Sequence, residues 1–120
     1  MTLQECYTAL DGDYADVLGR LRSERLIQKF VLKFLDDTSM DLLCRALEEG
    51  DCESAFRAAH TIKGMCMNLG FARMAESSGK MTEMLRAGDL NGGRALLEGV
   101  RADHARTVDA IRAFQAECSQ

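Results

Sequence analysis

The complete absence of proline constrains this chain more than any other feature of its sequence. A proline inside a helix removes a backbone hydrogen bond and costs about 3 kcal/mol, so a chain without any can be helical almost throughout. Its 120 residues, 47% of them hydrophobic, suffice for one modest core and are too few for two domains. The sequence therefore predicts a single all-α domain.

Glycine followed by aspartate marks three places along the chain: Gly12-Asp13, Gly50-Asp51 and Gly88-Asp89. Glycine at a helix end tolerates the left-handed conformation. The aspartate that follows can accept hydrogen bonds from the free N–H groups at the start of the next helix. These pairs therefore predict helix boundaries, with two short helices within residues 1–22 and longer ones after them.

Between these marks the apolar residues recur at helical spacing. Long helices are expected over about 23–49, 51–68, from 71 onward after Gly70, and 91–118, with a bend at Asp36-Asp37-Thr38-Ser39. Four amphipathic helices with short connections favour an up-down-up-down four-helix bundle over residues 23–120, flanked by the helices of residues 1–22. The expected inner faces hold Ile27, Val31, Phe34, Leu42 and Ala46; Phe71, Met74, Ser78, Met81 and Leu85; and Leu97, Val100, Thr107, Ile111 and Phe114.

Charge and hydropathy exclude some classes of partner. The net charge is −4 and no basic stripe is interleaved with aromatics, so nucleic acid is not expected as a partner. No apolar run approaches the roughly 18 residues of a membrane span, and no signal peptide is evident at the N-terminus. We expect a monomer that does not bind membranes.

The cysteines number five, an odd count, and form no Cys-x-x-Cys pair. This usage is typical of free thiols in a reducing cytosol, and it predicts a cytoplasmic protein. A disulfide framework or a zinc site is the alternative. The residues are Cys6, Cys44, Cys52, Cys66 and Cys118.

The segment from Asp51 to Gly64 carries the most informative pattern. Residues spaced by threes and fours predict one continuous buried stripe: Cys52, Ala55, Ala59, Ile62, Cys66 and Leu69. At about 100° per residue, His60 points about 130° away from the centre of that stripe, so its imidazole is expected at the surface.

Two residues beside His60 favour phosphoryl chemistry. Lys63 is its neighbour one turn on, and an ammonium there can donate charge-assisted hydrogen bonds to a phosphoryl group on the imidazole. Gly64 costs about 1 kcal/mol relative to alanine in mid-helix, which is explicable if another protein's backbone approaches the histidine. The three residues predict a docking face for phosphoryl transfer.

The run His60-Thr61-Ile62-Lys63-Gly64 resembles the histidine-containing phosphotransfer (HPt) domain family, as do two later runs, Leu69-Gly70-Phe71 and Leu85-Arg86-Ala87-Gly88-Asp89. The resemblance covers about residues 24–115. It implies that His60 is the phosphoacceptor, that Lys63 stabilises the phosphoryl group, and that Gly64 gives clearance to an incoming receiver domain.

The resemblance also implies partners and an absence of autonomous catalysis. The chain would be a phosphocarrier in a two-component phosphorelay, without an ATP site or cofactor of its own. Its partners would be a response-regulator receiver domain, which supplies Mg²⁺, and a sensor histidine kinase. The Gly92-Gly93 pair does not predict an ATP site, because it lacks the strand and the lysine of a phosphate-binding loop.

Two positions depart from the family pattern. Thr82 stands where members often carry glutamine and the related domain of chemotaxis kinases a glutamate, so a carboxylate that activates the histidine is missing unless Glu83 serves. Met65 replaces a residue that is usually small. Thr82 and Arg86 are accessory candidates at the site, and Phe56, Met67 and Phe71 are candidates for partner binding.

Two other classes of protein are alternatives to the phosphocarrier interpretation. A carboxylate-bridged metal bundle needs Glu-x-x-His pairs, but Arg57 and Arg101 stand three residues before His60 and His104. A phosphorylation-independent helical adaptor is opposed only by the presence of His60 with its lysine and glycine. His104 falls on the inner stripe of the last helix, so it is expected to be a packed or boundary residue without chemistry.

Overall fold

A computed structural model describes residues 1–118, and this part of the chain is helical with no strand. The all-α prediction is confirmed. The elements are α1 (Leu3–Ala9), α2 (Tyr14–Leu21), α3 (Glu24–Lys33), the 3₁₀ turn η1 (Phe34–Asp36), α4 (Ser39–Glu49), α5 (Cys52–Leu69), α6 (Ala72–Arg86), α7 (Leu90–Ala95) and α8 (Leu97–Cys118).

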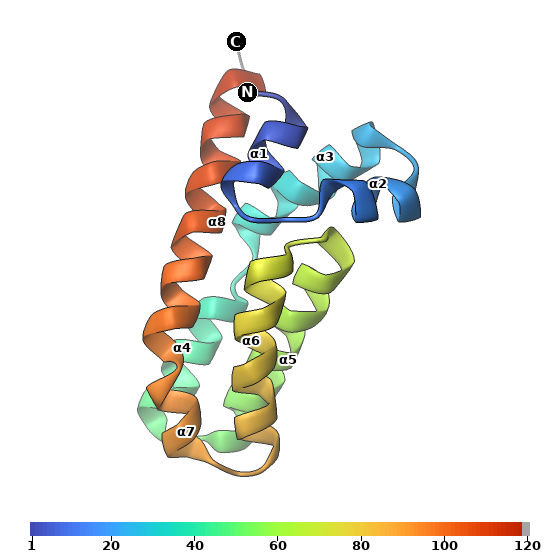
Figure 1. Ribbon diagram of the computed structural model, residues 1–120. Coiled ribbons are helices and arrows are strands. Elements are labelled where there is room, and N and C mark those ends of the chain that lie inside the picture. The colour runs from blue at the N-terminus through green and yellow to red at the C-terminus, as the bar shows by residue number, and fades with distance from the viewer. Residues whose placement is uncertain (119–120) are drawn as a thin grey trace.

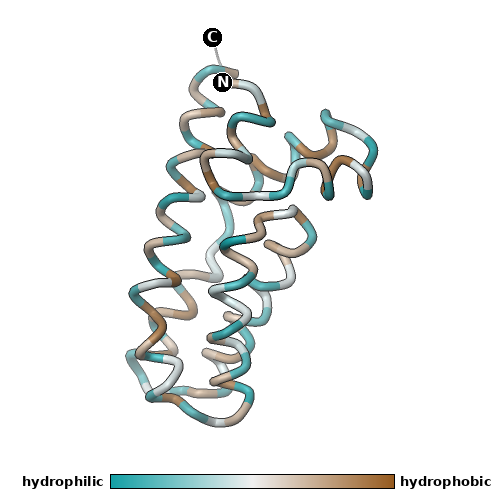
Figure 2. Tube along the Cα trace, in the orientation of Figure 1, coloured by the Kyte–Doolittle hydropathy of each residue, from teal (hydrophilic) through white to brown (hydrophobic). Residues whose placement is uncertain are grey.

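Four of these helices lie side by side along the long axis of an elongated molecule. They are α4, α5, α6 and α8, while α1, α2 and α3 gather at the end where the chain starts (Figure 1). Helix α5 packs against α4 and α6, and α8 packs against α6 and α1. Hydrophobic and hydrophilic residues alternate along each of them (Figure 2), so each helix has one face for the core.

The aspartates of the three Gly-Asp pairs cap helices as predicted. Asp13, Asp51 and Asp89 each accept a hydrogen bond from the backbone N–H three residues later, at the starts of α2, α5 and α7. Each bond satisfies one of the N–H groups that a helix start leaves without a partner.

The α1–α2 connection packs directly on the turn between α5 and α6. The backbone N–H of Asp13 donates to the Gly70 carbonyl at 2.7 Å, and the Tyr7 hydroxyl donates to the Leu69 carbonyl at 2.6 Å. In this connection the left-handed residue is Asp11 (φ 57°) rather than Gly12. Gly12 is needed for space, since a Cβ there would lie 2.9 Å from the Gly70 carbonyl oxygen.

The expected stretch 23–49 is divided rather than bent. Its first part is α3 followed by η1, and its second part is α4. At the start of α4 the Asp37 carboxylate accepts a hydrogen bond from the Ser39 N–H at 2.9 Å. The break changes the helical phase, so the prediction that Leu42 faces inward is wrong: Leu42 is 51% exposed and Leu43 is buried instead. The last predicted helix also divides, into α7, which contains Gly92-Gly93, and α8.

Two cysteines behave as small core residues. Cys6 and Cys66 are fully buried, and burial raises the pKa of the Cys6 thiol to about 11 and that of the Cys66 thiol to about 12. All five cysteines, three of them outside the core, carry free thiols. Within residues 1–118, no helix has the length and apolar character that crossing a membrane requires.

The contact at Gly70 predicts a stability difference between two glycines with similar backbone angles. Gly70 (φ 72°) would place a Cβ 2.9 Å from the Asp13 carbonyl oxygen, whereas a Cβ on Gly88 (φ 78°) would meet nothing within 4 Å. We expect Gly88→Ala to lower the free energy of unfolding by about 1 kcal/mol through left-handed strain. Gly70→Ala should lose a further 1–3 kcal/mol or so through overpacking. Urea unfolding measures both, and equal losses would contradict the packing described at Gly70.

Candidate functional site

Helix α5 places the candidate residues by burying one of its faces. The buried residues of α5 are Ala55, Ala58, Ala59, Ile62, Cys66 and Leu69. They include every residue of the predicted stripe except Cys52, which is partly exposed. Small side chains on this face let α4 and α6 approach closely. The rotation of α5 about its own axis is thereby fixed, and its opposite face lies in solvent.

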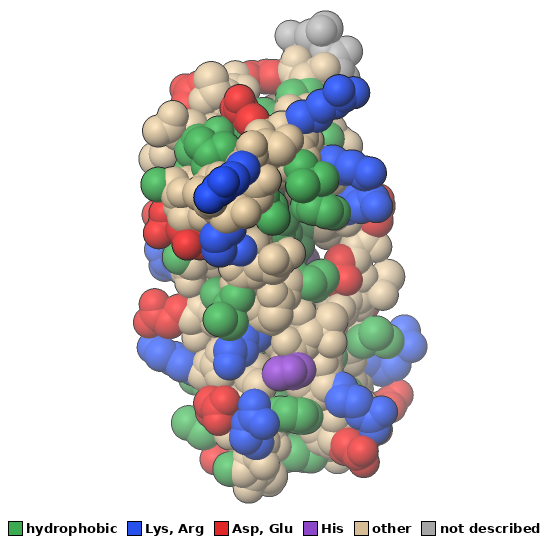
Figure 3. Space-filling model, turned by 90° about the vertical axis from the view of Figure 1, so that its right-hand side faces the viewer, with side chains coloured by type: hydrophobic (Ala, Val, Ile, Leu, Met, Phe, Trp, Pro, Cys, Tyr) green, Lys and Arg blue, Asp and Glu red, His purple; other side chains and the backbone are tan. Residues whose placement is uncertain are grey.

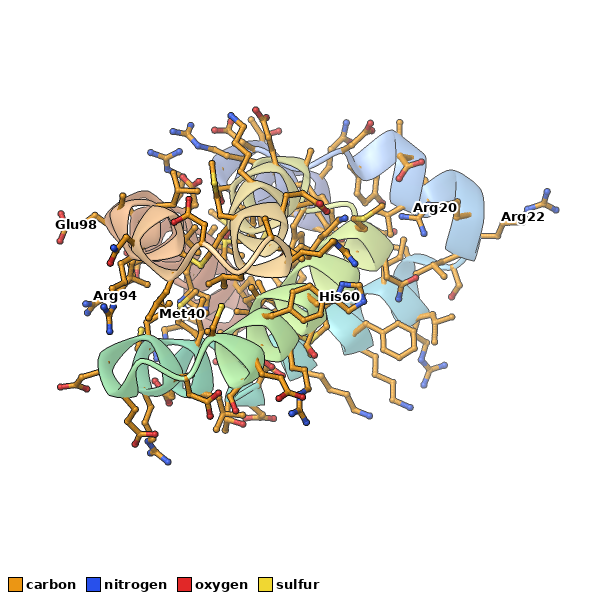
Figure 4. The ribbon with its side chains drawn as sticks, turned by 90° about the horizontal axis from the view of Figure 1, so that it is seen from below. Arg20, Arg22, Met40, His60, Arg94 and Glu98 are labelled. Carbon is orange, nitrogen blue, oxygen red and sulfur yellow. The ribbon has the colours of Figure 1, made fainter. Side chains whose placement is uncertain are left out.

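His60 lies on that solvent face, as predicted. Figure 3 shows a histidine open on one side of the molecule, with a hydrophobic side chain beneath it and Lys or Arg side chains to either side. Figure 4 shows the His60 side chain projecting from α5, away from α8. Within residues 1–118 the His60 imidazole makes no hydrogen bond and no ion pair, so both ring nitrogens are free for chemistry.

An aromatic ring supports the imidazole. The Phe56 ring, one turn before His60, stacks on it with 5.7 Å between ring centres and 17° between ring planes. The guanidinium carbon of Arg86, on α6, lies 5.0 Å from the centre of the same Phe56 ring. Arg86 in turn pairs with Glu83 at 3.3 Å. The candidate residue Phe56 therefore contacts both His60 and Arg86.

The side chain of Lys63 lies against α6. It is half-buried, and the aliphatic stem of its side chain runs over Gly79, where a Cβ would lie 3.7–4.0 Å from the stem carbons. Its ammonium has no ion-pair partner in the described part of the chain, so the charge is free to meet an anion. Sequence reasoning missed Gly79, although a glycine in the middle of a helix is an unusual choice that signals close approach.

Gly64 adds an open stretch of backbone beside His60. A Cβ built on Gly64 would meet nothing within 4 Å among the described residues. Met67, one turn further on, is 57% exposed. An open groove of about 460 Å³ borders this turn, between α5 and the α3–η1 segment. It is lined by Phe30, Lys33, Phe34, Asp36, Asp37, Met65, Asn68 and Leu69.

Two candidate residues lie in the core, and their predicted roles are corrected here. Thr82 is fully buried, and its hydroxyl donates to the Ser78 carbonyl at 2.7 Å, so it offers nothing to the His60 ring. Phe71 is also fully buried, with its ring centre 5.6 Å from Tyr7 and 5.3 Å from Phe34, so it cannot contact a partner. Phe71 lies on the inner face expected for this segment, and Thr82 lies one turn after buried Ser78 on the buried face of α6.

His104 contrasts with His60. It is half-buried on α8 with its ring 5.8 Å from the Phe34 ring. Burial lowers the pKa of His104, and the negative charges of Asp37 and Asp41 oppose that shift. The boundary position predicted for His104 is what the structure shows.

The described helices place an exposed histidine, followed by a lysine and an open stretch of backbone, on the surface of the molecule rather than in an enclosed cavity. The Hpt domain model matches residues 29–117, and the chain belongs to the Hpt domain family. Hpt domains have a phosphotransfer role in two-component signalling, and they are phosphocarriers rather than enzymes. No curated protein and no solved structure matches the chain.

The shifted pKa of His104 predicts a pH dependence of stability. Because burial favours the neutral ring, the unfolded chain binds more protons than the folded chain as the pH falls below the ordinary histidine pKa of 6.5. The contribution of His104 is thus complete above pH 6.5 and is lost as the pH falls through the lower folded-state pKa. We expect His104→Gln to flatten the unfolding free energy between about pH 7 and 5. Urea unfolding across this range tests it, and an unchanged slope would contradict it.

Proposed function

We propose that this protein is a phosphorelay intermediate that accepts a phosphoryl group on His60 and passes it to a response regulator. The observation that carries the proposal is the exposed imidazole of His60, free of hydrogen bonds within residues 1–118, on a helix whose Gly64 leaves the next turn open. Family membership supports it. A cytoplasmic location and a monomeric state belong to the same proposal.

The transfer would be a single in-line displacement. The lone pair on the unprotonated nitrogen of a neutral imidazole forms the N–P bond, while the P–O bond to the receiver's aspartate breaks and its electrons leave with the carboxylate. The reverse displacement loads the aspartate of a second receiver. Positioning and charge neutralisation dominate such reactions, and the Mg²⁺ that the reaction needs would come with the receiver.

The neighbours of His60 have separate roles in this proposal. The free Lys63 ammonium, guided by its stem over Gly79, would neutralise phosphoryl oxygens. Gly64 would let the receiver's backbone come close to the imidazole. Exposed Met67 would give the receiver a flexible apolar contact.

Two features of the architecture belong to the proposal as well. The side-by-side helices α4, α5, α6 and α8 would form an up-down-up-down four-helix bundle, as the helix lengths suggest. The helices of residues 1–22 would flank this bundle, whose domain we place at residues 23–120.

Removing the acceptor tests the proposal directly. A receiver domain charged with radiolabelled acetyl phosphate should transfer label to the wild-type chain and not to His60→Gln, because the amide has no nucleophilic nitrogen. Acid lability of the label would identify phosphohistidine. His104→Gln serves as the matched control and should be labelled like wild type. Equal labelling of His60→Gln would show that another residue accepts the phosphoryl group and would contradict the proposal. Absence of label on wild type would leave the phosphorylation-independent adaptor as the function.

Lys63→Ala tests the role of the free ammonium. We expect acceptance to continue at a rate reduced by about ten- to a hundredfold, since one charge-assisted hydrogen bond contributes about 1.5–3 kcal/mol. Quenched-flow measurement of label transfer gives the rate. Lys80→Ala is the control, because Lys80 is exposed and pairs with Glu76 at 3.3 Å on the same helix as Gly79. An unchanged rate in Lys63→Ala would refute the role assigned to Lys63.

A further inference from the structure

The imidazole of His60 has no polar anchor. It is exposed, and no hydrogen bond or ion pair within residues 1–118 holds it. Thr82, the accessory candidate on α6, donates its hydroxyl to the Ser78 carbonyl inside the core. A surface histidine with free χ1 and χ2 samples several rotamers, and in-line displacement needs one orientation of the attacking nitrogen. Another contact must restrict the ring.

The contact that the structure offers is the face of Phe56. The two rings lie 17° from parallel with centres 5.7 Å apart, which is the offset stacking that aromatic pairs favour. Phe56 is only half-exposed and packs against the core, so it moves less than a fully exposed side chain would. A stacked imidazole keeps its ring plane, while its ring nitrogens stay open at the edge.

Phe56 is itself restrained from the neighbouring helix. The guanidinium carbon of Arg86 lies 5.0 Å from the centre of the Phe56 ring, a distance that gives cation–π attraction. The ion pair of Arg86 with Glu83, 3.3 Å long, limits the rotamers of Arg86 in turn. Side chains of α6 therefore hold the aromatic ring on which the α5 imidazole rests.

We infer that Phe56 is a positioning residue for phosphoryl transfer: its ring, held by Arg86, orients the His60 imidazole by stacking, without a hydrogen bond. This inference deepens the proposed function and rests on it. Phe56 acts through the imidazole and touches no reacting atom.

The stacking can be measured without phosphorylation. In unphosphorylated wild-type protein, the ring current of Phe56 should shield the His60 ring protons, which two-dimensional NMR resolves. Phe56→Leu keeps an apolar side chain and removes the ring, so the His60 signals should move downfield. Phe56→Tyr should restore the shielding. Unmoved His60 signals in Phe56→Leu would overturn the inference, whatever the protein does with phosphate.

The transfer rate supplies the second readout. We expect Phe56→Leu to slow the acceptance of the phosphoryl group from a phosphorylated receiver about fivefold. At 1.36 kcal/mol per tenfold, this change in rate corresponds to about 1 kcal/mol in the activation free energy. Phe56→Tyr should stay within about twofold of wild type, since the phenol ring stacks equally well. A Phe56→Leu protein that shows the NMR change and transfers at the wild-type rate would also overturn the inference. Failure of wild type itself to accept label would instead contradict the proposed function.

Arg86 gives a variant that does not disturb the core. Arg86→Gln is a surface change that removes the cation over Phe56, and we expect it to move the His60 signals in the same direction as Phe56→Leu but by less. Arg86→Lys, which keeps the cation, should lie between Arg86→Gln and wild type. Lys80→Gln is the matched control, because it breaks the exposed Lys80–Glu76 pair on the same helix and should leave the signals in place. Equal spectra for Arg86→Gln and Lys80→Gln would remove Arg86 from the inference.

Discussion

The burial of one face of α5 is the constraint on which the rest of this structure depends. Small residues such as Ala55 and Ala59 bring α4 and α6 close to α5, and that close packing allows only one rotation of the helix about its axis. Everything at the candidate site follows from this rotation. The imidazole of His60 projects into solvent because the residue before it is packed in the core.

The site is completed across two helices, with little polar bonding. Lys63 is guided by its stem over Gly79 of α6, and Phe56 is held under Arg86 of the same helix. The imidazole thus has an aromatic face as its neighbour, and no carboxylate is bonded to it in the described residues. Within residues 1–118, no side chain occupies the ring nitrogens of His60, so they remain open to solvent.

The two histidines show how environment separates residues of one type. Both lie on long helices, α5 and α8. His104 is half-buried against Phe34, and its charged form is disfavoured by burial, so it contributes to stability. His60 has solvent on its open side and a stacked ring on the other. Exposure rather than residue identity therefore decides which histidine can meet a partner.

Sequence alone determined the all-α class, the caps at Asp13, Asp51 and Asp89, and the exposure of His60, because these depend on local periodicity and on hydrogen bonds spanning three residues. Tertiary packing decided the features that residue spacing along one helix does not predict. The break after η1 changed the phase of α4, so Leu42 turned outward, and the packing of α6 placed Thr82 in the core. The approach of α6 to α5 likewise set Gly79 under Lys63 and Arg86 over Phe56, since contacts between helices depend on how both are rotated together.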